Sequence, residues 1–273
     1  MGVLIKNGEV LEEVSDIDTV VFDKTGTITV GKPQVTDIVG DQNKVLTIAA
    51  SLEENSEHPL ATAVVKAAKE TKTEIKPVQN FAAIEGRGVK ANYGNQEAFV
   101  DSERLLEDIS ISQEMKDQAA KLQKEAKTVV YVGLGQEIIG LIAIQDVPKA
   151  SSKAAIAELK KRRLKTVMLT GDNENVAQAI GKEVGIDQVI AGVLPTEKAA
   201  EIKKLQDSGR TVAFVGDGIN DAPALSTANV GIAMGSGTDI AIESGGIVLV
   251  QNDLMGVVRA LEISKKRLSI ESS

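Results

Sequence analysis

The sequence predicts an α/β fold in which a doubly wound parallel sheet is interrupted, after its first strand, by an inserted α+β domain with an antiparallel sheet. Short aliphatic runs alternate with amphipathic helical stretches through the last half of the chain, which is typical of parallel strands joined by helices. A stretch of different character, about residues 34–140, lies before these runs and contains hairpin-like strands. We therefore expect residues 1–32 and 145–273 to form one domain and residues 33–144 to form the other.

The parallel sheet is expected to begin with Thr19–Phe22, directly before Asp23. Its later strands are expected at Thr166–Leu169, Val189–Val193, Val212–Val215, Val230–Ala233 and Ile247–Val250. The helical patterns between them cover Lys149–Lys161, Asn175–Val184 and Thr196–Asp207. Strands and helices at this spacing indicate a sheet with helices on both faces.

The inserted stretch opens with two helical patterns, Val45–Asn55 and Pro59–Thr71. Strands follow around Phe81, Val89–Tyr93 and Gln96–Val100, with the letters NYGNQE as a tight turn, then a helix near Ser112–Ala126 and a hairpin over Thr128–Ile144 around GLGQ. Strands paired by hairpins predict an antiparallel sheet. The two crossings, Val30–Pro33 and Ile144–Pro148, would be adjacent linkers and a plausible hinge.

Composition excludes several classes of function. The formal net charge of −8, without a basic stripe, argues against a nucleic-acid partner. With no cysteine and one histidine, the chain offers almost no ligand to a soft metal ion, so any metal it handles itself should be hard and oxygen-bound. The apolar runs are far shorter than the ~20 residues of a transmembrane helix, and the start lacks a signal-peptide core. We therefore expect a soluble chain.

Asp23 is the first candidate for chemistry. It stands at the carboxyl end of a predicted parallel strand, where open α/β sheets bind their ligands. The turn KTGT after it can direct backbone N–H groups toward an anion. A lone Asp in such a place would more often form only a structural Asx turn.

A second strand ends in a carboxylate within VAFVGDGINDAPAL, residues 212–225. Asp217 lies between two glycines and is followed by Asn220 and Asp221 before a helix, which Asp221 could simply cap. Two strand-end carboxylates that face one point need a cation, and Mg²⁺ suits oxygen ligands. These residues therefore predict a magnesium site near Asp23.

Two further elements complete the predicted phosphate site. Thr170, Gly171 and Asp172 follow another strand, where a hydroxyl and a free N–H can hold a phosphate oxygen. Lys198 lies early in a helix and would, without the other three motifs, be read as an ordinary solvated lysine. Together the four elements indicate phosphoryl transfer to Asp23, with Mg²⁺ and Lys198 offsetting charge and Thr170 positioning the phosphate.

The motifs DKTGT, TGDN and GDGINDAPAL, in this order, resemble those of the P-type ATPases, ion pumps whose phosphorylation domain has the haloacid-dehalogenase-like fold. The resemblance covers essentially the whole chain as the phosphorylation and nucleotide-binding domains. It implies ATP and Mg²⁺ as cofactors, Asp23 as the aspartyl-phosphate, and Mg²⁺ ligands from Asp23, the Thr25 carbonyl and Asp217. The catalytic positions it implies are Asp23, Lys24, Thr25, Thr170, Gly171, Lys198, Asn220 and Asp221.

The inserted domain resembles that of heavy-metal pumps of the CPx type, copper exporters especially, through SEHPLATAV at residues 56–64. In that family Glu53 and His58 would lie in the ATP pocket, and Gly86 and Gly88 would match its Gly-x-Gly loop. We also assign Asp172 to cofactor binding. A histidine before a helix-opening proline could instead have only a structural role.

The sequence departs from this family at one place. A Gly-Asn pair usually follows the next strand, where this chain has Val100, Asp101 and Ser102. Part of the nucleotide pocket would then be rebuilt, with consequences for ATP affinity or discrimination.

The resemblance implies partners that the chain itself does not contain, namely the actuator and transmembrane domains of a pump. GVLIKNGEVLEE near the start is expected to be the exit from a preceding helix, and VVRALEISKKRL a helix that returns toward a membrane, so the fragment would lie on its cytoplasmic face. The transported ion would not bind here, and Cu⁺, Cu²⁺, Zn²⁺ and Cd²⁺ stay open, with copper favoured by the resemblance.

Two other functions are compatible with the motifs. A free-standing phosphatase of the dehalogenase superfamily would carry a second Asp two positions after the nucleophile as general acid and base, where this chain has Thr25. A non-catalytic nucleotide-sensing module would not need an intact nucleophile and magnesium site.

Overall fold

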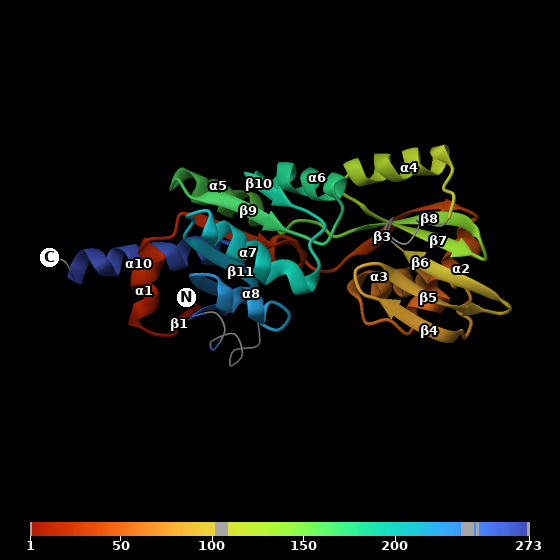
Figure 1. The fold of residues 1–273 in the computed structure, drawn as a ribbon, viewed down its shortest axis with the longest axis horizontal. Coiled ribbons are helices and arrows are strands. Elements are labelled where there is room, and N and C mark those ends of the chain that lie inside the picture. The colour runs from red at the N-terminus through yellow and green to blue at the C-terminus, as the bar shows by residue number, and fades with distance from the viewer. Residues whose placement is uncertain (1, 102–108, 236–242, 244–245, 272–273) are drawn as a thin grey trace. The chain divides into compact units, whose positions relative to one another are not determined.

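The computed structural model describes residues 2–101, 109–235, 243 and 246–271. It divides into two compact units (Figure 1), unit 1 from Met1–Val30 and Pro148–Ser273 and unit 2 from Gly31–Val147. The sequence-based expectation set these boundaries at 32/33 and 144/145. Each unit has its own sheet and its own hydrophobic core.

Unit 1 is built on a seven-stranded sheet. Its strands, in spatial order, are β1 (Val3–Ile5), β13 (Gly246–Leu249), β12 (Val230–Met234), β11 (Val212–Asp217), β2 (Thr19–Asp23), β9 (Lys165–Leu169) and β10 (Gln188–Ile190). All neighbours pair in parallel except β1 with β13. The expected doubly wound sheet is therefore confirmed.

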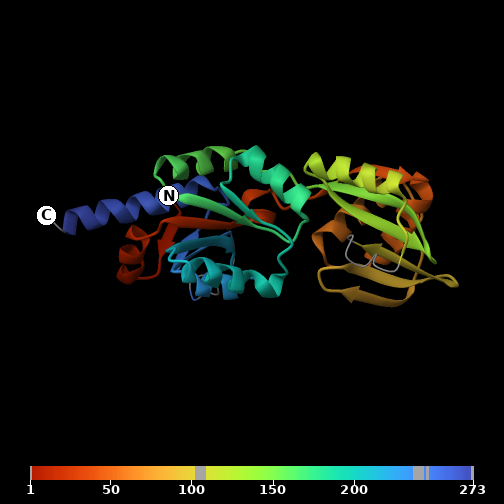
Figure 2. The same ribbon diagram turned by 45° about the horizontal axis from the view of Figure 1, so that its top comes forward.

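Helices cover both faces of this sheet. They are α1 (Gly8–Ser15), α5 (Ser152–Lys161), α6 (Glu174–Val184), α7 (Lys198–Asp207), α8 (Ala222–Thr227) and α10 (Met255–Glu271). In both views α5 and α6 lie on one face and α7 and α8 on the other (Figures 1 and 2). Because both faces are covered, the central strands are buried throughout, as in β2, where all five residues are buried.

Local sequence signals explain where helices start and stop. The Asn173 side chain accepts a hydrogen bond from the Val176 N–H and caps the start of α6, which ends at Gly185 with φ +84°. In unit 2, His58 caps α3 in the same way, with Pro59 as its first residue.

Unit 2 is built on a six-stranded antiparallel sheet. Its strands, in spatial order, are β3 (Gln34–Gly40), β8 (Glu137–Gln145), β7 (Thr128–Leu134), β6 (Gln96–Asp101), β5 (Gly88–Tyr93) and β4 (Gln79–Ile84). The helices α2 (Gln42–Glu53) and α3 (Pro59–Glu70) share a core with one face of this sheet, and α4 (Gln113–Lys124) shares a second core with the other. The expected α+β architecture is confirmed.

The structure corrects several expected elements. The start is the strand β1 followed by α1, where the exit from a helix was expected. Strand β3 was not predicted, and β10 ends at Ile190 rather than Val193. The helix expected over Thr196–Asp207 is a 3₁₀ turn, Pro195–Glu197, followed by α7. These elements are short or lie at a sheet edge, where hydrophobic periodicity is weak.

The two crossings between the units lie side by side at their ends. Thr29 and Pro148 form an isolated antiparallel bridge, and the Gly31 N–H donates to Asp146 Oδ1 at 2.9 Å. Within the described residues, we find no helix that combines the length and the apolar character needed to cross a membrane.

Candidate active site

The structure brings Asp23 and Lys198 together. Asp23 ends β2 and is 7% exposed, and its Oδ1 lies 3.0 Å from Lys198 Nζ. Burial, with Asp221 next in importance, raises the pKa of Asp23 to about 7, although the Lys198 ammonium opposes the rise. A buried carboxylate and a cation therefore meet at the carboxyl end of a parallel strand, where ligands bind in such sheets.

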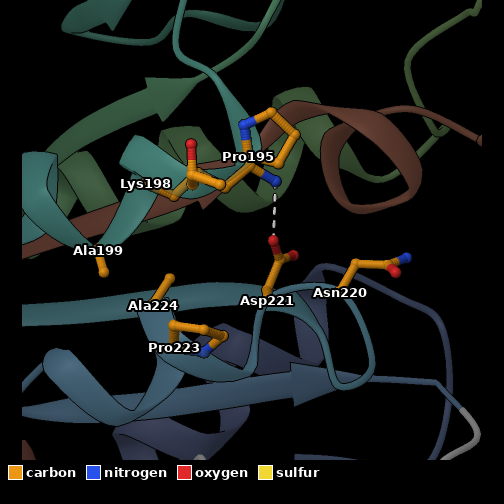
Figure 3. A pocket seen from close by; sticks show the side chains of 8 residues that line it. Pro195, Lys198, Ala199, Asn220, Asp221, Pro223 and Ala224 are labelled. Atoms are coloured by element: carbon orange, nitrogen blue, oxygen red, sulfur yellow. Dashed lines mark hydrogen bonds and ion pairs between the residues drawn. The ribbon is translucent and has the colours of Figure 1, made fainter. Parts of the chain in front are cut away.

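Lys198 bridges two carboxylates. Its Nζ also lies 2.8 Å from Oδ1 of Asp221, a contact seen in Figure 3 together with the pocket that these residues help to line. Burial works to lower the pKa of Lys198, but Asp23 and Asp221 outweigh it, and the net shift is upward. Lys198 is thus held as an ammonium next to Asp23.

The loop after β11 is folded around its own carboxylates. Oδ1 of Asp217 accepts from the N–H groups of Ile219 (3.1 Å) and Asn220 (2.8 Å), and the Asp217 N–H donates to Asp221 Oδ2 (3.1 Å). Asp221, 1% exposed, has a raised pKa, mainly because it is buried. A Cβ on Gly216 would come within 2.4 Å of Asp221 Oδ2, so only glycine leaves room for this carboxylate.

Lys24, assigned to catalysis on the sequence, contacts a different carboxylate. Its Nζ lies 2.6 Å from Oδ2 of Asp172, and both side chains are largely buried. The same loop turns at Gly26, with φ +75°, and closes with a hydrogen bond from the Thr29 N–H to the Lys24 carbonyl at 3.0 Å. Thr25 lies in this loop, between Lys24 and the turn.

The loop after β9 carries the second predicted phosphate contact. Thr170 is buried, and its Oγ1 accepts from the Asp172 N–H at 3.1 Å. A Cβ on Gly171 would lie 3.4 Å from its nearest neighbour, the Val193 carbonyl oxygen, which is an ordinary van der Waals distance. Gly171 therefore needs no special room in this structure.

The magnesium ligands implied by the resemblance fit the charges at this site. Besides burial, the charges of Asp221 and Asp217 raise the pKa of Asp23, so three carboxylates act on one another, and Lys198 contacts two of them, Asp23 and Asp221. Such an arrangement favours a bound divalent cation. Among the described residues no group of three or more acidic or histidine side chains forms a metal site, and the implied set, which includes the Thr25 carbonyl, does not require one.

Four of the predicted nucleotide residues, Glu53, His58, Gly86 and Gly88, lie in unit 2, whereas Asp172 lies in unit 1. Glu53 ends α2 and is 9% exposed, and burial raises its pKa to about 7 against a hydrogen bond from Ser56. His58, at the start of α3, is exposed, and its Nδ1 accepts from the Leu60 N–H at 3.2 Å. A carboxyl group at the end of α2 and an imidazole at the start of α3 thus lie close together in the chain.

The glycine loop between β4 and β5 has a structural reason for its second glycine. Gly86 and Gly88 both have positive φ, +69° and +147°. A Cβ on Gly88 would lie 2.2 Å from the Val100 carbonyl oxygen and 2.8 Å from the Asp101 Cα. Gly88 therefore lets β5 approach β6, whether or not a nucleotide also uses this space.

Asp101, one of the three residues at the place of the usual Gly-Asn pair, is buried beside Gly88, with which it pairs across the sheet. Ser102, another of the three, lies outside the described residues. The ion pair of Lys24 with Asp172 is the main feature that the sequence did not predict. The available signal was that both residues closely follow neighbouring parallel strands.

Comparison with known proteins gives a consistent result. Residues 17–229 match the family model of haloacid dehalogenase-like hydrolases. The copper-exporting P-type ATPase of Staphylococcus haemolyticus is 48% identical over 98% of this chain, and the probable copper-exporting P-type ATPase of Archaeoglobus fulgidus is 47% identical, also over 98%. The chain spans 34% of the length of each of these relatives.

Solved structures are similar over nearly the whole chain. The catalytic domain of the CPx-ATPase CopB-B, studied for its conformational changes upon nucleotide binding, has a TM-score of 0.74 and 35% identity, covering 95% of this chain and 94% of that one. A zinc-transporting PIB-type ATPase in its E2.Pi state has a TM-score of 0.69 and 38% identity, covering 98% of this chain and 44% of that one.

Proposed function

Because this chain belongs to the haloacid dehalogenase-like hydrolases and to the catalytic domains of CPx-type P-type ATPases, we propose that it is the phosphorylating part of an ATP-driven copper pump. Asp23 accepts the γ-phosphate of ATP and becomes an aspartyl-phosphate. The observation that carries this proposal is the bridge that Lys198 makes between Asp23 Oδ1 (3.0 Å) and Asp221 Oδ1 (2.8 Å).

The transfer requires an ionised Asp23. One carboxylate oxygen attacks the γ-phosphorus, the bond to the bridging oxygen breaks, and ADP leaves with that electron pair. Lys198 offsets the charge on the phosphoryl oxygens and, because its own pKa is raised, it stays charged while doing so. Thr25, Thr170, Gly171 and Asn220 contact the phosphoryl group from three loops, and Asp221 holds Lys198.

Mg²⁺ is the second cofactor of this proposal. Asp23, the Thr25 carbonyl and Asp217 would hold it, and when bound it supplies positive charge to the phosphoryl oxygens. The effect of the Asp221 and Asp217 charges on Asp23 supports this assignment.

The nucleotide is bound by unit 2 in this proposal. Glu53 and His58 contact the adenine end of ATP, and the turn with Gly86 and Gly88 allows close approach of the nucleotide. The buried position of Glu53 and the positive φ values of Gly86 and Gly88 support this assignment of the nucleotide site.

The parent protein would be an integral membrane pump, with the present chain on the cytoplasmic face and the actuator and transmembrane domains as its partners. Copper is favoured over zinc because the copper-exporting relatives are 48% and 47% identical to this chain, whereas the zinc-transporting structure is 38% identical. The transported ion binds outside this chain.

Incubation with γ-labelled ATP and Mg²⁺ tests the proposal. We expect a label that survives acid and is released by hydroxylamine. Asp23→Asn should abolish it while leaving ATP binding intact, and Asp207→Asn, at an exposed surface ion pair, should keep it. A label that persists in Asp23→Asn would show that another residue is the nucleophile.

The same experiment separates the proposal from its alternatives. A free-standing phosphatase would lose its label rapidly, because a general acid and base two positions after the nucleophile speeds hydrolysis of the aspartyl-phosphate. This chain has Thr25 at that position. A stable label favours the pump, since a threonine there activates water poorly. If the unsubstituted chain binds ATP but is not labelled, a non-catalytic nucleotide module is favoured.

A further inference from the structure

The ion pair of Lys24 with Asp172 joins two loops of the proposed phosphorylation site. Lys24 directly follows β2, Asp172 lies shortly after β9, and these strands are parallel neighbours in which Asp23 is opposite Leu169. Lys24 Nζ lies 2.6 Å from Asp172 Oδ2, with side chains 6% and 14% exposed. A short, largely buried contact of this kind fixes the position of both side chains.

The two lysines near Asp23 therefore have different partners. The Lys198 ammonium contacts Asp23 and Asp221. The Lys24 ammonium contacts Asp172. The charge of Lys24 is already balanced inside the protein, and the cation placed on the nucleophile is Lys198.

The backbone on each side of the pair is held by hydrogen bonds. The Lys24 carbonyl accepts from the Thr29 N–H at 3.0 Å. The Asp172 N–H donates to Thr170 Oγ1 at 3.1 Å, and the Asp172 carbonyl accepts from the Gly192 N–H at 2.8 Å. Hydrogen bonds thus hold the backbone at both residues, and the ion pair joins the two loops through their side chains.

The loops carry the groups that must converge on one phosphate. Thr25 follows Lys24, and Thr170 and Gly171 precede Asp172. We infer that Lys24 and Asp172 are a pair of positioning residues that holds Thr25 against Thr170 and Gly171, and that neither side chain binds phosphate or nucleotide. The inference rests on the proposed function, and it replaces the direct roles that the sequence suggested for both residues.

A charge-removal cycle tests the inference, because a buried ion pair responds differently to the loss of one partner and of both. Removing one partner leaves an uncompensated buried charge, whereas removing both is often tolerated. The variants are Lys24→Met, Asp172→Asn and the double variant. Asn keeps the shape of Asp172, and Met keeps the length of the Lys24 stem.

We expect each single variant to lower the rate of labelling at saturating ATP by about 100-fold, as for a misplaced reacting group. The double variant should regain most of this loss, to within about tenfold of the parent chain. The melting temperature should follow the same order, falling in both single variants and recovering in the double one. The ATP dissociation constant should not change, because the proposed contacts with the adenine end of ATP lie in unit 2. Lys204→Met, at a surface ion pair with Glu201, is the matched control and should behave as the parent.

Three results would overturn the inference. A double variant as slow as Lys24→Met would mean that the Lys24 charge acts on the phosphate. An Asp172→Asn variant with weaker ATP binding and an unchanged rate at saturation would make Asp172 a nucleotide ligand. An Asp172→Asn variant with the rate and affinity of the parent would mean that the pair positions nothing. Failure of the proposed function is recognised separately, since the parent chain itself would then not be labelled, while the melting temperatures still test the pairing.

Discussion

Glu53 should make unit 2 less stable as the pH rises, and replacing it by Gln should remove this effect. Burial raises the pKa of Glu53 from its ordinary value of 4.5 to about 7 in the folded chain. Between these two values the folded state binds more protons than the unfolded state. Stability therefore falls as the pH rises through this window, and the loss is complete above about pH 7.

The size of the effect follows from the same two values. The interval from 4.5 to about 7, at about 1.4 kcal/mol per pH unit, corresponds to at most about 3.5 kcal/mol of unfolding free energy. Gln keeps the shape of the side chain and can still hydrogen bond with Ser56, but it carries no charge. Glu53→Gln should therefore be about as stable as the parent near pH 5 and more stable at pH 8.

Urea unfolding at pH 5 and pH 8, followed by circular dichroism, measures the difference. Glu54→Gln, at the exposed neighbouring position, is the control and should show no gain at pH 8. If Glu53→Gln unfolds at the same urea concentration as the parent at both pH values, the carboxyl group is not held in an unfavourable environment. If the variant is less stable at pH 8, an ionised Glu53 stabilises the fold, and the reasoning is wrong in sign.

Three further predictions concern the site and its support. Lys198→Met should slow labelling of Asp23 by about 10²–10³-fold, because it removes the cation at 3.0 Å, and should leave ATP binding unchanged; an unchanged rate would contradict the role of Lys198. Removing divalent cations with EDTA should abolish labelling and added Mg²⁺ should restore it; labelling in EDTA would refute the metal assignment. Gly88→Ala should destabilise unit 2 by about 1–3 kcal/mol, because its Cβ would lie 2.2 Å from the Val100 carbonyl oxygen. The control Gly94→Ala, whose Cβ would have no heavy atom within 4 Å, should destabilise it by about 1 kcal/mol. Equal melting temperatures of the two variants would contradict the close approach of β5 to β6.

Much of the fold was predictable because its central strands carry a strong signal. The strand β2 is buried on both faces and is therefore mostly apolar before Asp23. The strand β3 was missed because it lies at a sheet edge, with polar residues at exposed positions, and its partner β8 is far away in the sequence. The strand β1, with three residues, is too short for a periodicity to be recognised.

The candidate site was predictable to the level of loops but not of contacts. The carboxyl ends of parallel strands meet at one edge of a sheet, so the sequence alone brings Asp23 near Asp217. Which lysine contacts which carboxylate depends on side-chain conformations that no spacing encodes. The sequence therefore gave Lys24 and Lys198 similar roles, whereas the structure separates them.

The separation of the two lysines bears on the proposed role of a metal at this site. With Lys24 balanced by Asp172, the charges around Asp23 are those of Asp217, Asp221 and Lys198, three carboxylates in all for one ammonium. A phosphoryl group that enters this site adds further negative charge, and Lys198 is already shared between two carboxylates. Burial, with Asp221 next in importance, raises the pKa of Asp23, and a nucleophile that holds a proton cannot attack. A divalent cation between Asp23 and Asp217 would correct both problems at once. In the proposed function, activation of the Asp23 nucleophile would thus be linked to binding of the metal.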